Sequence, residues 1–231
     1  MSDKIPRKHK TASCMLEAKY LAQGYQHIIG IDEAGRGPMA GPLVAGAVCL
    51  PLDDIDALKE ALKGVKDSKE MTRNQREDAF TRIQETALAW GIGSVDAHEM
   101  PQVGNMTQVT YLAIKRAVTQ AIDNGAITKP DVLLIDYLKL PADDYDGIPQ
   151  EAIKHGEKHS LSIAAASVLA KVYRDERMRE YAEQYPEYGF DQHKGYPTKA
   201  HRLALQTYGA TPIHRVNYRP VQDAIEARNS S

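Results

Sequence analysis

Short apolar runs recur along this chain at intervals that suit a β-sheet. Residues 28–32 (IIGID), 43–50 (LVAGAVCL) and 131–136 (DVLLID) are almost wholly apolar, and residues 90–95 (WGIGSV) form a further run. Runs of this length, bounded by Gly, Pro or polar residues, are typical of strands covered on both faces. The pattern therefore predicts four strands.

Longer stretches carry apolar residues three and four positions apart and predict helices. One helix begins at Thr72, which precedes a periodic run that includes Phe80 and Ile83. Another spans residues 107–123 and ends at Asn124-Gly125, a typical helix stop. Further helices are predicted within residues 4–26, at 162–181 and at 198–208.

The order of these elements predicts the fold class. Strands cluster early and then alternate with helices, which indicates an α/β fold with a mixed β-sheet flanked by helices and a helical C-terminal portion. We divide the chain into an N-terminal helical extension (1–26), a main domain (27–221) and a polar tail (222–231).

Composition narrows the class of protein but leaves its function open. The chain has 231 residues, of which 42% are hydrophobic and 26% charged, as in an ordinary globular protein. No apolar run is long enough to span a membrane, and no apolar segment follows the basic N-terminus as a secretory signal would require. Cys14 and Cys49 lack metal-ligand spacing and suit a reducing compartment, so we expect a cytoplasmic protein. We also expect it to be a monomer. The net charge of −2 neither supports nor excludes nucleic-acid binding, which depends on local surface charge.

Acidic residues stand where two predicted strands end. Asp32 and Glu33 close one apolar run and Asp136 closes another. Buried carboxylates are costly unless they are paired or bind a metal. Oxygen ligands suit Mg²⁺ or Mn²⁺, and the lack of clustered Cys or His argues against zinc. Because adjacent strand residues face opposite sides, Asp32 and Glu33 can share an ion only if the strand breaks there. We expect Gly35 and Gly37 to supply that break.

A nucleotide-cofactor site is an alternative interpretation of the same segment. Residues 35–40 (GRGPMA) match the dinucleotide-binding pattern G-x-G-x-x-[GA] after a strand. That pattern needs a helix to begin within the glycines, whereas Pro38, Gly41 and Pro42 lead here into a β-rich run. Two neighbouring acids would also repel a pyrophosphate, so the metal site is favoured.

Six motifs, taken in order, resemble the ribonuclease HII family from about Ile28 to Val221. They are D-E-A-G-R-G-P at 32–38, D-S-K at 67–69, I-D at 135–136, S-I-A-A-A-S at 162–167, H-K-G-Y-P-T at 193–198, and H-R with P-V at 214–215 and 220–221. Each motif alone is moderately specific, and the ordered set is highly specific.

The resemblance implies a ribonuclease H-like fold and a site of four catalytic, metal-binding carboxylates. Asp32, Glu33 and Asp136 fill three places. The fourth is usually Asp in a K-G-D segment, and Glu157 stands there in this chain, as Glu does in the related ribonuclease HIII enzymes. Tyr137 is a second departure, because the family commonly has Gly after the strand-end Asp.

The resemblance also implies the substrate and the reaction. An endonuclease of this family uses Mg²⁺ or Mn²⁺ in a two-metal mechanism to cut RNA in RNA–DNA hybrids, or single ribonucleotides in duplex DNA. The cut leaves 3′-hydroxyl and 5′-phosphate ends. Gly35, Arg36 and Gly37 would read the 2′-hydroxyl, Tyr196 would stack on the sugar at the junction, and Lys69 would contact phosphate.

Alternatives remain for several of these residues. Arg36 could merely pair with a neighbouring acid, and Glu157 could be a solvated loop acid. In that case the chain would be a non-catalytic nucleic-acid-binding relative. His193, His201 and His214 lack ligand spacing and are expected to be hydrogen-bonded structural groups.

Overall fold

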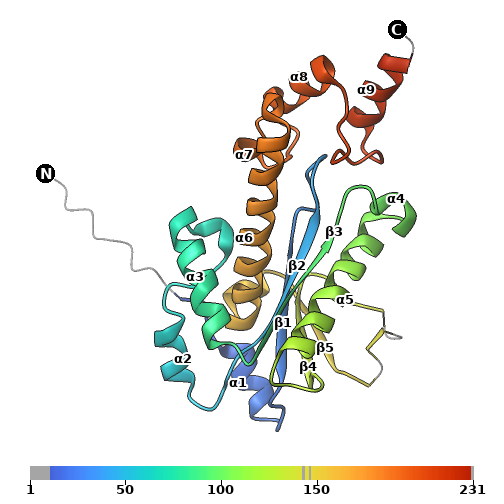
Figure 1. The fold of residues 1–231 in the computed structure, drawn as a ribbon. Coiled ribbons are helices and arrows are strands. Elements are labelled where there is room, and N and C mark those ends of the chain that lie inside the picture. The colour runs from blue at the N-terminus through green and yellow to red at the C-terminus, as the bar shows by residue number, and fades with distance from the viewer. Residues whose placement is uncertain (1–10, 142–143, 146, 230–231) are drawn as a thin grey trace, which may run out of the picture.

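A five-stranded mixed sheet lies at the centre of the protein, in a computed structural model that describes residues 11–141, 144–145 and 147–229 (Figure 1). The strand order is β3-β2-β1-β4-β5. The strands are β1 (Ile28–Ala34), β2 (Leu43–Cys49), β3 (Ala89–Val95), β4 (Val132–Asp136) and β5 (Gln150–Ile153). β1 pairs antiparallel with β2 but parallel with β4, so the carboxyl ends of β1 and β4 meet at one edge. The expected α/β fold is confirmed.

Helices surround this sheet and continue beyond it. They are α1 (Met15–Leu21), α2 (Ile55–Ala61), α3 (Arg73–Thr86), α4 (Met100–Val103), α5 (Met106–Asn124), α6 (Leu161–Gln184), α7 (Phe190–His193), α8 (Lys199–Tyr208) and α9 (Arg219–Asn229), with short 3-10 helices η1 (Ser68–Glu70), η3 (Gly156–Lys158) and η4 (Pro186–Tyr188). Within the described residues, no helix is long and apolar enough to cross a membrane.

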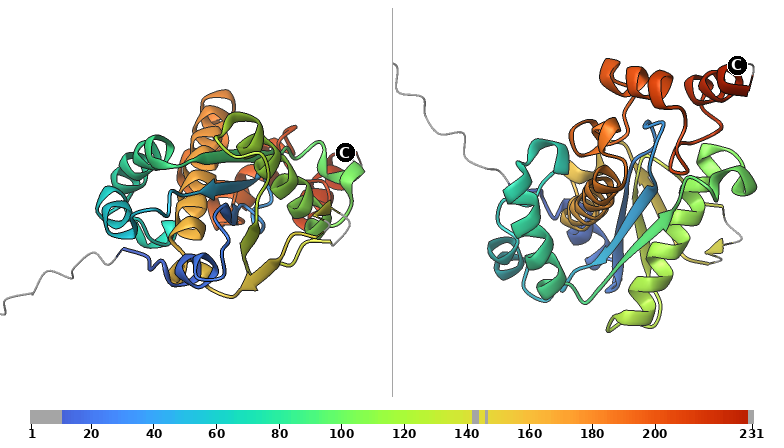
Figure 2. Two further views of the ribbon diagram at one scale, coloured as in Figure 1. Left: turned by 90° about the horizontal axis from the view of Figure 1, so that it is seen from below. Right: turned by 45° about the horizontal axis from the view of Figure 1, so that its top comes forward.

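The sheet has a hydrophobic core on each face. α6 packs on one face, where Ile28, Val48 and Leu134 belong to its core, and α5 packs on the other (Figure 2). α6 lies very close to the strands, because a Cβ on Gly30 would come within 2.2 Å of the backbone of Ser162. This close approach brings the start of α6 against the end of β1, where the predicted acids lie.

The C-terminal helices lie beyond one end of the sheet. α6 has 24 residues and is about 36 Å long, and it runs from the sheet towards α7 and α8 (Figure 1). The loop after β1 joins the two parts, since Met39 donates its N–H to the carbonyl of Gly195 and Ala40 bridges to His214. The sheet edge therefore faces the helical portion.

Strong local signals predicted several elements correctly. α3 begins after Thr72, whose side chain forms a capping box with Gln75. α5 ends at Asn124, before Gly125, as the sequence indicates. The helix predicted at 162–181 is α6, and the helix predicted at 198–208 is α8.

Other elements differ from the sequence expectation. Of the helix expected within residues 4–26, the structure has Met15–Leu21, and residues 4–10 lie outside the described part. β5 and the short helices α2 and α4 were not predicted, because runs of four to seven residues show little periodicity. Residues 222–229, assigned to a tail, are helical and form most of α9.

The strand break expected between Asp32 and Glu33 is absent. β1 continues through Ala34 and pairs Glu33 with Ala45 and Ala34 with Val44 of β2. Pairing with β2 keeps the strand regular for two residues longer than Gly35 and Gly37 suggested, so the backbone leaves the sheet only at Gly35.

Candidate active site

Two of the predicted acids are brought together by the register of parallel strands. Ile31 of β1 lies opposite Ile135 of β4, so the next residues, Asp32 and Asp136, stand level at the sheet edge. Asp32 is only 7% exposed. The apolar strands thus place two carboxylates side by side at the point where both strands reach the edge.

Glu157 reaches the same edge from another element. It lies in η3, directly before α6, and is 6% exposed. The N–H of Gly156 donates to Oδ1 of Asp136 at 3.0 Å, which ties this turn to β4. Nδ1 of His155 lies 3.7 Å from Oε1 of Glu157. Glu157 is therefore a buried residue of the site and not a solvated loop acid.

Lys69 faces this group of carboxylates. Burial alone would lower the pKa of Lys69, but Asp67 and then Asp32, Glu157 and Asp136 act on its ammonium group and raise it. Three of the predicted acids therefore act on one cation. The turn that carries Lys69 is held by Asp67, which accepts its N–H at 3.0 Å.

Asp32 lies at the electrostatic centre of the cluster. Burial raises the pKa of its carboxyl group well above the usual value, and the charges of Glu33 and Asp136 raise it further. Hydrogen bonds from the N–H of Glu33, at 2.7 Å, and from Ser167 of α6 oppose this rise. The buried carboxylates therefore repel one another, and a bound cation would relieve this repulsion.

Glu33 is paired with an arginine of the glycine loop. Its carboxylate lies 3.5 Å from Nη1 of Arg36. Burial raises the pKa of Glu33, Arg36 lowers it and Asp136 raises it. Its Oε2 atom is buried and lacks a hydrogen-bond partner among the described residues. The pairing of Arg36 with a neighbouring acid, left open by the sequence, is present.

The donor set fits a hard divalent cation, although the side chains are not yet turned towards one. Across the described ranges, no three Asp, Glu, His or Cys side chains already stand as ligands of a single ion. The guanidinium of Arg36 lies beside the Glu33 carboxylate, and the N–H of Gly156 donates to one oxygen of Asp136. Four buried or half-buried carboxylates, one with an orphaned oxygen, still match the oxygen ligands of Mg²⁺ and Mn²⁺.

The glycine loop after β1 is fixed by its carbonyl groups. Arg215, 1% exposed, donates to the carbonyl oxygens of Gly35 at 2.6 Å and Arg36 at 3.2 Å. The hydroxyl of Tyr218 also donates to the Arg36 carbonyl, at 2.6 Å. In the described structure, no hydrogen bond uses the N–H of Gly35, Arg36 or Gly37. Arg36 is partly exposed and Gly37 is exposed, so their N–H groups are available to a ligand, whereas Gly35 is buried.

A second buried arginine makes glycine necessary in this loop. Gly35 has φ of 100°, and a Cβ there would lie 2.3 Å from Nε of Arg174. Arg174 donates to the carbonyls of Pro42 and Lys194, at 2.9 and 3.0 Å. Burial, with a smaller effect of Arg215, lowers the pKa of Arg174 to about 10. The H-R motif contains Arg215 but none of the six motifs contains Arg174, and the role of both arginines in holding the loop depends on contacts distant in sequence.

Tyr196 stands beside this loop. Its side chain is 46% exposed, and its ring lies 3.5 Å from where a Cβ on Gly37 would stand. Its carbonyl accepts a hydrogen bond from the ring of His201 at 3.0 Å. The structure thus places the exposed ring next to Gly37.

The three histidines form a buried structural group. The rings of His193 and His201 stack at 4.3 Å, and Nε2 of His201 lies 3.1 Å from Nε2 of His214. Burial lowers the pKa of both His201 and His214 to about 4, so both are neutral at pH 7. The expectation of hydrogen-bonded structural histidines agrees with these contacts.

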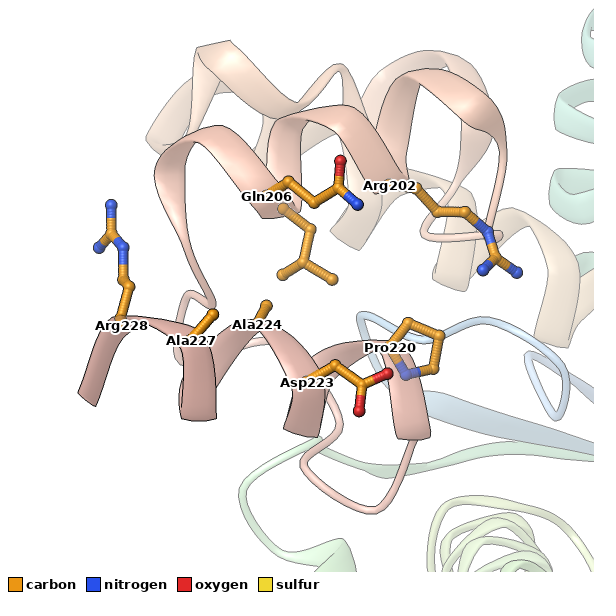
Figure 3. A pocket seen from close by; sticks show the side chains of 8 residues that line it. Arg202, Gln206, Pro220, Asp223, Ala224, Ala227 and Arg228 are labelled. Carbon is orange, nitrogen blue, oxygen red and sulfur yellow. The ribbon is translucent and has the colours of Figure 1, made fainter. Parts of the chain in front are cut away.

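A separate cavity lies between α8 and α9 (Figure 3). It has a volume of about 440 Å³, with Arg202 at one end and Arg228 at the other. None of the predicted site residues lines it. The candidate active site is therefore the sheet edge with its glycine loop, and not this cavity.

Comparison with known proteins adds independent findings. The model of the family described as Ribonuclease HII matches residues 29–221. A ribonuclease HII of Halalkalibacterium halodurans is 44% identical over 210 residues, covering 91% of this chain and 74% of that protein. The crystal structure of the ribonuclease H2 from Pyrococcus horikoshii OT3 is similar with a TM-score of 0.71 and 26% identity, covering 88% of this chain and 99% of that one. The structure of Bst-RNase HIII in complex with Mn²⁺ is similar with a TM-score of 0.68 and 19% identity, covering 100% of this chain and 75% of that one, and shows the fold alone.

Proposed function

This chain belongs to the ribonuclease HII family, and from that premise we propose that it cuts single ribonucleotides embedded in duplex DNA as well as longer RNA tracts. It is a ribonuclease H enzyme, an endoribonuclease that acts on the RNA of RNA–DNA hybrids. Cleavage at single ribonucleotides is supported by one observation. The protein combines a cluster of buried carboxylates with a loop whose backbone N–H groups are free. The expected products have 3′-hydroxyl and 5′-phosphate ends.

Asp32, Glu33, Asp136 and Glu157 would hold two divalent cations, Mg²⁺ or Mn²⁺. When bound, such ions activate a water molecule and stabilise the charge on the leaving 3′-oxygen. The raised pKa of Asp32 and the orphaned oxygen of Glu33 support this assignment. Bst-RNase HIII, which shares the fold, is described in complex with Mn²⁺.

Asp32 would contribute to both metal positions. It lies level with Asp136 on one side and is adjacent to Glu33 in sequence on the other. The Glu33 N–H donates to one oxygen of its carboxylate at 2.7 Å, which restricts the orientation of the side chain. Fixed ligands reduce the reorganisation needed when substrate binds.

The glycine loop is suited to recognise the 2′-hydroxyl of a ribonucleotide. Arg215 and Tyr218 occupy the carbonyls of Gly35 and Arg36, which leaves the N–H groups of 35–37 to donate to a sugar oxygen. The 2′-hydroxyl is the group that separates RNA from DNA. A loop without Cβ atoms at Gly35 and Gly37 lets the backbone approach that sugar closely.

Two further side chains would position the nucleic acid. Lys69, whose ammonium group faces the carboxylates, would contact a phosphate next to the cut. Tyr196, exposed beside Gly37, would stack on the sugar at the RNA–DNA junction. Both roles rest on family resemblance together with these placements.

We also propose the compartment and the oligomeric state of the enzyme. Cys14 and Cys49 are free and buried, which suits a reducing compartment, and we propose that the enzyme works in the cytoplasm. We further propose that it acts as a monomer.

The test is cleavage of a labelled DNA duplex that carries one ribonucleotide, alongside a long RNA–DNA hybrid and an all-DNA duplex. Metal-dependent cutting of the first two, with none of the third, is expected. Cutting of the hybrid alone would remove the single-ribonucleotide activity. Tight binding with no cutting in either metal would favour a non-catalytic nucleic-acid-binding relative instead.

A further inference from the structure

Unusual backbone conformations lie next to the active site. In the described residues, three non-glycine residues have φ in the left-handed region: Tyr137 at 67°, His155 at 60° and Lys194 at 52°. Each lies within two residues of Asp136, Glu157 or Tyr196. Left-handed backbone is unfavourable for residues with a Cβ, persists where the surrounding structure holds it, and is found often at active sites.

Tyr137 is the most unusual of the three. Asn and Asp tolerate this conformation better than bulky residues do, and Gly tolerates it best. The backbone is held there by two hydrogen bonds, from the Tyr137 N–H to the Ile153 carbonyl at 3.0 Å and from the Leu138 N–H to the Asp136 carbonyl at 2.8 Å. A large aromatic residue therefore occupies a position that favours glycine.

The ring of Tyr137 contributes little to the fold. Its side chain is 66% exposed, the largest fraction among the exposed large hydrophobic residues of the described structure. No hydrogen bond or ring stacking joins its side chain to the rest of the described chain. Among the described residues, the exposed ring therefore makes no hydrogen bond or ring contact that would offset the unfavourable backbone.

The position of Tyr137 indicates what the ring could contact. Tyr137 follows Asp136 directly, where β4 ends, and its N–H donates to the Ile153 carbonyl of β5. Tyr196 lies against Gly37, on the glycine-loop side of the carboxylates. Exposed aromatic rings beside a nuclease site are suited to stack on a base or sugar.

We propose that Tyr137 is a substrate-positioning residue whose exposed ring packs on a nucleotide of the bound strand on the β4 side of the carboxylates. The proposal rests on the function proposed above. The nucleotide packs on the ring at the end of β4, so Tyr137 and Tyr196 contact the nucleic acid from different elements. This contact offsets the cost of the left-handed backbone.

Four substitutions at one position separate the ring from the backbone. Tyr137→Gly removes both the ring and the strain, and Tyr137→Asn removes the ring but keeps a residue that tolerates this φ. Tyr137→Phe keeps both, and Tyr137→Trp places a reporter on the site. Affinity for the one-ribonucleotide duplex is measured by anisotropy without added metal, kcat/KM with Mg²⁺, and Tm without nucleic acid.

We expect Tyr137→Gly to raise the stability of the protein and to weaken its binding of substrate. Tyr137→Gly raises Tm by about 2–4 °C, while its affinity and kcat/KM fall about tenfold, in keeping with loss of one stacking contact. Tyr137→Asn shows the same loss of affinity, and Tyr137→Phe stays within about twofold of the wild type. The fluorescence of Tyr137→Trp changes on duplex binding, whereas a Tyr208→Trp control on α8 does not respond to the same extent.

Two results would overturn the assignment. Full affinity and kcat/KM in Tyr137→Gly would show that the ring makes no substrate contact. An equal loss in Tyr137→Phe would show that the phenol hydroxyl, and not packing of the ring, is responsible. A wild type that binds the duplex without cutting it would defeat the proposed nuclease function, while the affinities would still decide the role of Tyr137.

Discussion

Glu157 shows how one residue departs from the usual pattern yet keeps its place. It is buried in a turn that the Gly156 N–H fixes to Asp136, at 3.0 Å. The backbone of the turn is therefore set, and the side chain must be long enough to reach from it. We therefore expect the glutamate to serve as a ligand in the proposed metal site.

Shortening this side chain should weaken metal binding. Glu157→Asp withdraws the carboxylate by one methylene, and a displacement of about 1 Å at a preorganised ligand is enough to impair a site. We expect kcat with Mg²⁺ to fall about tenfold in Glu157→Asp and about a hundredfold or more in Glu157→Gln. Steady-state cleavage with Mg²⁺ and Mn²⁺ measures both; full activity of Glu157→Gln would remove Glu157 from the ligand set.

Acidic residues that end an apolar run can be assigned to a site from the sequence. Asp32 and Asp136 end buried runs, so their placement at one edge could be predicted. The φ of 67° at Tyr137 was not predicted, because tyrosine rarely adopts this conformation, although the family's usual Gly at this position is consistent with it. The regular strand at Glu33 was missed because its cause is pairing with β2.

At the scale of elements, α1 anchors the segment that carries Glu157. Glu17 of α1 is fully buried, and its Oε1 accepts hydrogen bonds from Ser160 Oγ at 2.6 Å and from the Ser162 N–H at 2.9 Å. The Leu16 N–H donates to the His159 carbonyl at 3.1 Å. The carboxyl group thus caps the start of α6, although burial raises the pKa of Glu17.

Removing this cap should loosen the site as well as the fold. Glu17→Ala leaves Ser162 and Ser160 without their buried partner and should cost about 2 kcal/mol of unfolding free energy. Glu17→Gln keeps an acceptor and should cost less. Because Glu157 lies just before this helix, Glu17→Ala should also need more Mn²⁺ for half-maximal cleavage. Urea unfolding and a metal titration test both; an unchanged metal requirement would limit Glu17 to stability.

The glycine loop depends on Arg215, whose guanidinium reaches four carbonyl oxygens, those of Gly35, Arg36, Gly41 and Pro42. Lysine cannot reproduce this fork of donors. Arg215→Lys should therefore lower kcat/KM on the one-ribonucleotide duplex by about tenfold or more while Mn²⁺ binding is retained. Calorimetric Mn²⁺ titration is the control, and unchanged cleavage would show that the loop holds its shape without this residue.

Elements with strong local signals were predictable and short ones were not. The capping box at Thr72 and the stop at Asn124-Gly125 marked α3 and α5 correctly. β5 is a four-residue, half-exposed strand whose existence depends on pairing with β4. α9 carries one fully buried residue, Val221, so its polar sequence resembled a tail.

At the scale of the whole molecule, the histidine group links the C-terminal helices to the sheet. His201 lies in α8, and His214 lies beside Ala40 of the loop after β1. Both are neutral because burial lowers the pKa of each to about 4. Protonation of either would place a charge in this interior.

The protein should therefore lose stability in mild acid. Since the folded pKa of about 4 is below the usual value of 6.5, the unfolded chain binds more protons between these pH values. Stability from this source is complete above pH 6.5 and is lost as the pH falls, by about 1.4 kcal/mol per pH unit for each histidine. Urea unfolding from pH 7.5 to 4.5 measures it. His201→Asn should flatten the profile, and an unchanged slope would contradict this assignment.

The buried carboxylate cluster, as the metal site of a ribonuclease, is tested most directly by Asp32→Asn, which keeps the shape of the side chain and removes its charge. Cleavage and binding of a duplex with one ribonucleotide are measured together for this variant and the wild type in Mn²⁺. We expect cleavage to fall at least a thousandfold while affinity stays within about threefold, because a metal ligand is lost and the nucleic-acid contacts remain. Undiminished cleavage by Asp32→Asn would contradict the account.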